Sequence, residues 1–165
     1  MIIAAHAGTG KTTLARMFPE KIVDFVCMPY KYYLSEDCEY DEANKANPDL
    51  EMHEDWPYNY VDAIIEAHKD GKTLLIPPVW SVLIHLEMEK LPYILCYPRR
   101  DAKEIYRQRY IERGNSEEFL SIFIGSWDRF IDAFEADTYG QHIVLESYQF
   151  LSDVLLKSEE VGAKW

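Results

Sequence analysis

Short apolar runs alternate along the chain with segments in which apolar residues recur at helical spacing. The apolar runs are rich in aliphatic side chains and predict five strands, at residues 1–5, 22–26, 73–76, 92–97 and 142–145. The segments between and after them predict helices at residues 12–18, 57–69, 81–90, 101–112, 119–134 and 150–157. Strands separated by helical segments of this length are typical of βαβ units, in which helices cover both faces of a parallel sheet. Right-handed crossovers then place the carboxyl ends of all strands at one edge, where ligands bind.

The helix predicted at 119–134 has aromatic residues on one side: Phe119, Phe123, Trp127, Phe130 and Phe134. An apolar stripe at helical spacing is typical of a face that packs on the core. We therefore expect these rings to be structural.

One segment interrupts the alternation of strands and helices. Residues 27–55 have no clear period, and within them residues 35–55 hold nine acidic residues and one basic residue, Lys45. Long segments of this kind are typical of solvated flaps or of regions that contact substrate. The sequence leaves both interpretations open.

The composition is that of a globular protein. The chain has 165 residues, of which 48% are hydrophobic, and a formal net charge of −12. This length buries a full core without disulfides, so we expect one domain over residues 1–165. The negative charge argues against a sequence-independent grip on nucleic acid or on an anionic membrane. The three cysteines form no C-x-x-C pair, and from the residue pattern we expect neither a signal peptide nor a membrane span of about 20 apolar residues. We expect a cytoplasmic protein without nucleic-acid or membrane partners. The sequence does not indicate its oligomeric state.

The first predicted strand runs directly into the sequence AHAGTGKTT at residues 5–13. This is the phosphate-loop motif G-x-x-x-x-G-K-[ST] with Ala5 in place of the first glycine. Small residues let backbone N–H groups wrap around a phosphate, and the following helix directs its positive end at the same anion. We expect Lys11 to reach the β- and γ-phosphates of ATP and the Thr12 hydroxyl to bind Mg²⁺. The predicted ATP-binding residues are His6, Ala7, Gly8, Thr9, Gly10, Lys11, Thr12 and Thr13.

Together with the strand pattern, the motif predicts an α/β, three-layer P-loop NTPase fold with a five-stranded parallel sheet.

A basic cluster interrupts the acidic background between residues 99 and 113. Six basic and three acidic residues give this window a charge of +3 in a chain of −12. The basic residues are Arg99, Arg100, Lys103, Arg107, Arg109 and Arg113. Arg109 and Arg113 are four residues apart, so they share one face of the predicted helix. The cluster follows the fourth strand, at the edge that should carry the phosphate loop, where guanidinium groups can bind phosphate. A surface helix with Arg–Glu pairs is the alternative interpretation.

With these features the chain resembles nucleoside monophosphate kinases. The stretch RYIERGNSEEF at residues 109–119 is similar to the lid of guanylate kinases, R-L-x-x-R-G-T-x-S-E-E. A nearer likeness, over almost the whole chain, is to small adenylate-kinase-like P-loop proteins of phages and prophages. It rests on the phosphate loop, Asp24, the pair Tyr30-Lys31, the sequence WPYNY at 56–60 and the R-G-N of the lid.

The resemblance implies ATP-dependent phosphoryl transfer, with Mg²⁺, to a nucleotide or nucleoside. It also implies an acceptor-binding insertion at about residues 27–60 and a lid at about residues 99–118. On that lid, Arg109 and Arg113 would screen the transferred group, while Lys11 acts from the loop. A kinase for a small non-nucleotide acceptor and a nucleotide-binding regulatory protein with little turnover remain open.

The chain departs from the kinase pattern at its third strand. That strand ends in Ile76-Pro77-Pro78, where such kinases carry an aspartate that helps to hold Mg²⁺. Asp24, at the end of the second strand, is the acid placed to take the metal or catalytic role instead. A turn-forming cap is the alternative for Asp24.

Two other features have alternative interpretations. His6, within the loop, is placed to contact a phosphate oxygen or to serve as a structural side chain. The aromatic run at 30–33 could clamp a base in the acceptor site or pack a long loop.

Overall fold

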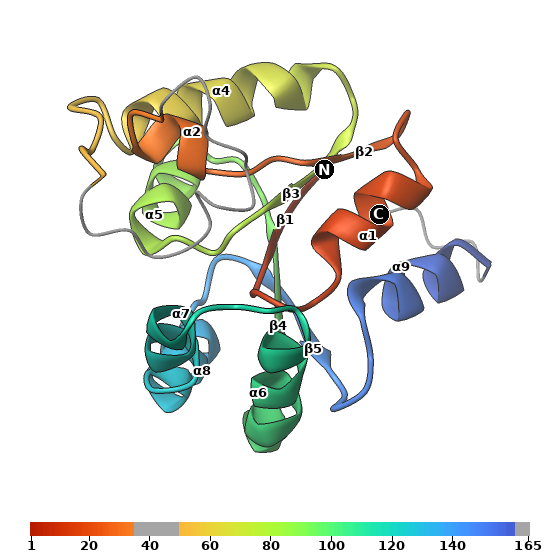
Figure 1. Ribbon diagram of the computed structural model, residues 1–165. Helices are drawn as coiled ribbons and strands as arrows, with labels where there is room; N and C mark the ends of the chain where they lie inside the picture. The colour runs from red at the N-terminus through yellow and green to blue at the C-terminus, as the bar shows by residue number, and fades with distance from the viewer. Residues whose placement is uncertain (35–49, 161–165) are drawn as a thin grey trace.

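The computed structural model describes residues 1–34 and 50–160 (Figure 1). The fold is α/β, with a five-stranded sheet in the order β2-β3-β1-β4-β5. The strands are β1 (Ile2–Ala5), β2 (Ile22–Asp24), β3 (Thr73–Ile76), β4 (Ile94–Pro98) and β5 (Gln141–Leu145). All neighbouring pairs are parallel; Ile3, for example, lies opposite Leu75 on one side and Ile94 on the other. The predicted fold class is confirmed.

Helices follow each strand, as the sequence pattern predicts. They are α1 (Lys11–Met17), α2 (Met28–Lys31), α4 (Tyr58–Lys69), α5 (Trp80–Met88), α6 (Lys103–Glu112), α7 (Glu117–Phe123), α8 (Trp127–Glu135) and α9 (Leu151–Glu160), with a short 3-10 turn, η1 (Arg100–Ala102), before α6. Within the residues described, none of these helices combines the length and apolar character needed to cross a bilayer.

Two hydrophobic clusters cover the two faces of the sheet. Alternate strand residues such as Ile2 and Leu95 pack against α4, α5, α6 and α8, with the fully buried Trp127 in this cluster. The residues between them, such as Ile3, pack against Leu14 of α1 and against α9. Figure 1 shows α1 and α9 together on one side of the sheet, opposite α4 and α5. This arrangement gives the three layers expected of the P-loop architecture.

The central position of β1 determines where a ligand can bind. The chain builds β2 and β3 on one side of β1 and then crosses to β4 and β5 on the other. The loop that follows β1 therefore begins where the strand order reverses. In open α/β sheets the crevice at this switch point is the usual ligand site. The phosphate-loop sequence occupies this position.

The aromatic segment predicted as one helix is two helices, α7 and α8. They are separated at Gly125, where a Cβ would lie 2.1 Å from the carbonyl oxygen of Ser121. Only glycine permits this close approach, so the chain can turn there. The aromatic period continues across the break because both helices face the same core. Phe119, Trp127 and Phe134 are buried in it, as the stripe predicted.

Candidate phosphate-binding site

The loop between β1 and α1 turns through two glycines in the left-handed region. Gly8 has φ 78° and Gly10 has φ 93°. These values favour glycine because a Cβ is strained there. Between them, Thr9 is fully buried, and its hydroxyl donates to the carbonyl oxygen of His6 at 2.8 Å. The local sequence therefore forms the tight turn that the motif predicts.

Neighbouring elements hold this turn from outside. The hydroxyl of Tyr110, on α6, donates to the carbonyl oxygen of Ala7 at 3.0 Å. The backbone N–H of Leu151, at the start of α9, donates to the carbonyl oxygen of Thr9 at 2.9 Å. A Cβ on Gly8 would lie 2.9 Å from Cε1 of Tyr110. Gly8 is thus required for space as well as for its backbone angles.

Lys11 is folded back onto the loop. Its Nζ donates to the carbonyl oxygens of Ala5 at 2.7 Å and His6 at 3.1 Å. Burial is the main cause that lowers the pKa of Lys11 to about 8; the Asp24 carboxylate opposes this shift and the charge of Arg113 adds to it. Lys11 therefore remains mainly protonated at neutral pH. It is a partly desolvated cation whose present partners are neutral carbonyls, so an anion would be a stronger partner.

The structure brings together Thr12 and Asp24, the two residues predicted to bind a metal. The Thr12 hydroxyl donates to Oδ2 of Asp24 at 2.5 Å. The other carboxylate oxygen, Oδ1, is buried and has no hydrogen-bond partner among the described residues. A buried carboxylate oxygen is costly unless something binds it. This oxygen fits a hard cation, or the water around one, because Mg²⁺ prefers oxygen ligands.

Within the part of the chain that the structure describes, no larger metal cluster surrounds this pair. Across the described ranges, no group of three or more His, Cys, Asp or Glu side chains could hold a metal ion. β3 ends at Ile76 and contributes no carboxylate. Thr12 and Asp24 would therefore share a Mg²⁺ ion with water and phosphate oxygens, which is how proteins usually bind this ion.

The basic cluster divides into two groups. Its first members form exposed ion pairs: Arg99 with Asp101 and Glu146, Arg100 with Asp128, Asp132 and Glu135, and Lys103 with Asp128. For this group the surface-helix interpretation describes the structure better than phosphate binding does. The last members, Arg109 and Arg113, lie toward the loop.

Arg109 braces the phosphate loop. Its guanidinium carbon lies 4.6 Å from the ring centroid of Tyr106 and 4.2 Å from that of Phe150. Its nitrogens donate to the carbonyl oxygens of Gly8 at 3.4 Å and Ser147 at 3.3 Å. A guanidinium stacked between two rings is held in one plane. Arg109 thus links α6, the loop and the segment between β5 and α9.

Arg113 is the member of the cluster best placed to meet a ligand. It caps the C-terminal end of α6, is exposed, and lies close enough to Lys11 to lower its pKa. Among the described residues no carboxylate forms an ion pair with it. Lys11 and Arg113, two cations of separate elements, therefore lie close enough to interact, and the Asp24 carboxylate acts on Lys11 from the end of β2.

His6 is not where a phosphate contact would require it. Its imidazole is 1% exposed and lies among five aromatic rings. Burial and, to a smaller extent, the charge of Lys11 lower the pKa of His6 to about 3. Its backbone N–H donates to the carbonyl oxygen of Cys96 at 2.9 Å. The structure thus gives His6 a packing role, in place of the expected phosphate contact.

The aromatic residues near the predicted acceptor site pack mainly on one another. The ring of Tyr30 lies 5.1 Å from that of the buried Tyr60, and Trp56 stacks on Tyr60 at 5.8 Å. Nζ of Lys31 lies over the rings of Tyr32 at 4.9 Å and Trp56 at 5.9 Å. Tyr30 therefore follows the packing interpretation. Residues 35–49 of the acidic stretch at 35–55 lie outside the described residues.

Sequence reasoning missed the tyrosines that support the loop. Tyr106 and Tyr110 are fully buried against it, and both precede an arginine of the site by three residues. Residues 106, 109, 110 and 113 follow helical spacing and share one face of α6. That spacing is the signal that could have identified them.

No protein-family model matches the chain, and no curated protein is significantly similar to it.

Proposed function

We propose that this protein is a phosphotransferase that uses ATP and Mg²⁺ to phosphorylate a nucleotide or nucleoside. The observation that carries the proposal is the convergence of Lys11, Arg113 and the Thr12–Asp24 pair on the glycine turn at the switch point of the sheet. A glycine turn with two nearby cations and an acid–hydroxyl pair supports this proposal, because phosphoryl transfer requires positioning and charge.

Different residues of the site would hold the phosphates of ATP and the Mg²⁺ ion. Backbone N–H groups of residues 7–13 would surround the phosphates, and Lys11 would exchange its carbonyl partners for phosphate oxygens. Thr12 and Asp24 would hold Mg²⁺, whose charge offsets that of the phosphate chain. Arg113 would approach from the lid and neutralise charge on the transferred group. Arg109 and Tyr110 keep the turn in shape.

The acceptor would bind between the insertion at 27–60 and the lid at 99–118. A small non-nucleotide acceptor is the related alternative, because the same architecture serves many substrates. Such a reaction draws on cytoplasmic ATP, and we propose the cytoplasm as its location. The net charge of −12 supports a small-molecule partner over nucleic acid or an anionic membrane.

One observation favours a second candidate, a nucleotide-binding regulatory protein with little turnover. β3 ends at Ile76 without the carboxylate that nucleotide kinases use beside Mg²⁺. If Asp24 does not replace it, the protein would bind ATP without efficient transfer.

A product assay separates these functions. The protein would be incubated with ATP, Mg²⁺ and a panel of nucleosides, nucleoside monophosphates, sugars and small acids, followed by chromatography. We expect ADP together with a phosphorylated nucleoside or nucleotide. Lys11→Met keeps an unbranched side chain without the charge and should abolish product formation, while circular dichroism checks that it folds. ATP binding without acceptor-dependent ADP supports the regulatory function, and unchanged turnover in Lys11→Met contradicts the role of Lys11.

A further inference from the structure

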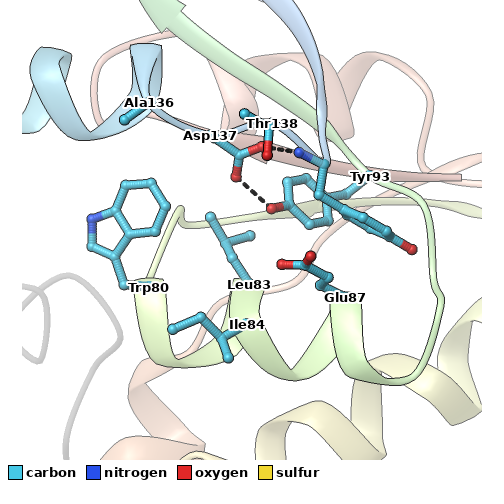
Figure 2. A pocket seen from close by; sticks show the side chains of 9 residues that line it. Trp80, Leu83, Ile84, Glu87, Tyr93, Ala136, Asp137 and Thr138 are labelled. Carbon is cyan, nitrogen blue, oxygen red and sulfur yellow. Dashed lines mark hydrogen bonds between the residues drawn. The ribbon is translucent and has the colours of Figure 1, made fainter.

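A separate cavity lies at the opposite edge of the sheet from the phosphate loop. It has a volume of about 180 Å³ and opens between α5 and the turn that follows α8 (Figure 2). Tyr93 directly precedes β4, and Tyr139 lies two residues before β5. The cavity is therefore at the amino ends of the strands, and none of the residues assigned to the phosphate site lines it.

The walls of the cavity are largely aromatic. Trp80 comes from α5, whereas Tyr93 and Tyr139 come from the segments before β4 and β5, with ring centroids 5.6 Å apart. Leu83 forms part of the floor and is buried. Figure 2 shows the indole of Trp80 at one end and the ring of Tyr93 beside Asp137. Aromatic faces carry partial negative charge and attract cations.

Two carboxylates add a negative potential. The side chain of Asp137 is 5% exposed. Its Oδ2 accepts from the Tyr93 hydroxyl at 2.6 Å, and its Oδ1 accepts from the backbone N–H groups of Tyr139 at 3.0 Å and Gly140 at 2.7 Å. These donors are neutral, so they orient the carboxylate without cancelling its charge. Glu87 lines the cavity from α5 and is exposed.

The pKa of Tyr93 also reflects the negative charges of the two carboxylates. Burial raises the pKa of Tyr93, and the hydrogen bond to Asp137 and the charges of Asp137 and Glu87 raise it further. Both carboxylates are thus close to the same ring. Among the described residues, one basic side chain lies within ion-pair distance of these two carboxylates. It is that of His142, whose Nε2 is 3.8 Å from Oδ1 of Asp137.

We propose that this cavity binds an alkylammonium group, with Trp80, Tyr93 and Tyr139 contacting its alkyl substituents and Glu87 and Asp137 balancing its charge. A metal ion fits less well, because both oxygens of Asp137 already accept hydrogen bonds and the residues described here hold no cluster of metal ligands. An anion would be repelled by the two carboxylates. The cavity is of a size for a small substituted amine rather than a nucleotide. This inference does not rest on the function proposed for the phosphate loop.

Choline and its neutral isostere, 3,3-dimethylbutan-1-ol, provide a matched test. Each would be titrated into the ¹⁵N-labelled protein, with the indole N–H of Trp80 assigned through its loss in Trp80→Phe. We expect choline to shift the signals of Trp80 and Gly140 in a saturable manner, with a dissociation constant on the order of 1 mM. The isostere should bind at least fivefold more weakly, because it lacks the charge.

Charge variants sharpen the test without disturbing the fold. Glu87 is exposed, so Glu87→Gln should fold normally and weaken choline binding about fivefold. Glu89→Gln, at the end of the same helix and outside the cavity lining, should leave it unchanged. A peptide carrying trimethyllysine, titrated in parallel, separates the two sources of the group. Tighter binding than choline assigns the cavity to a protein side chain, and equal or weaker binding assigns it to a free amine. Equal affinity for the isostere, no saturable shift, or no effect of Glu87→Gln would overturn the proposal.

Discussion

The two ends of the basic segment at 99–113 have similar composition and different surroundings. At the first end, Nη2 of Arg100 lies 2.7 Å from Oδ1 of Asp132 and 2.8 Å from Oε2 of Glu135, so the charge of Arg100 is already paired. At the other end, Arg113 has no such pair among the described residues and lies near Lys11. The comparison teaches that a cluster of arginines in a sequence marks a basic segment but does not show which charges are available to a ligand.

The largest expected effect separates these two arginines. Arg113→Ala should lower the rate of acceptor-dependent ADP formation by about 1,000-fold, because arginines that neutralise a transferred phosphoryl group contribute on this scale. ATP affinity should change much less. Arg100→Ala removes a charge from the same segment and should leave the rate unchanged. Steady-state kinetics at saturating ATP measures both variants, and equal losses would contradict the comparison.

A second pair of variants compares the loop with the C-terminal end of α6. Gly8 and Gly114 have similar φ values, 78° and 74°, but only Gly8 lies against a side chain. Gly8→Ala should lower the free energy of unfolding by about 3 kcal/mol, from backbone strain and displacement of Tyr110. Gly114→Ala should cost about 1 kcal/mol from strain alone. Urea denaturation gives both values, and similar losses would show that Tyr110 does not support the turn.

The free energy of unfolding should depend on pH through the buried His6. Because the pKa of His6 is about 3 in the folded protein and near 6.5 when unfolded, the unfolded state binds the proton first as the pH falls. The contribution of neutral His6 to stability is therefore complete above pH 6.5 and decreases below it. Between pH 7 and pH 5 we expect a loss of about 2 kcal/mol from this residue. His6→Phe should remove that part of the pH dependence, as measured by urea denaturation at each pH. The same slope in both proteins would mean that His6 is accessible to protons in the folded state.

The parts of the fold that follow from local pattern could be predicted. The parallel sheet and the glycine turn follow from apolar runs, helical spacing and a motif whose chemistry is local. The break between α7 and α8 could not be predicted from period alone, because the aromatic spacing continues through Gly125. α2 is a single short turn within a segment that lacks a period.

The candidate site shows the same division. Lys11, Thr12 and Asp24 lie together because the motif and the end of β2 place them at one edge. The roles of His6, Arg99 and Arg109 depend on partners distant in sequence, such as Trp127, Glu146 and Ser147. Such contacts are decided by tertiary packing, which no local pattern reports. The sequence therefore located these residues better than it located the partners of their side chains.

Calorimetric titration with ATP and Mg²⁺ tests the central claim most directly. We predict saturable binding at one site, strong reduction of affinity in Lys11→Met, and unchanged affinity in Lys103→Ala, whose charge is paired with Asp128 on the surface. Absence of heat in the wild-type protein, or equal affinity in Lys11→Met, would contradict the assignment of this loop as a phosphate-binding site.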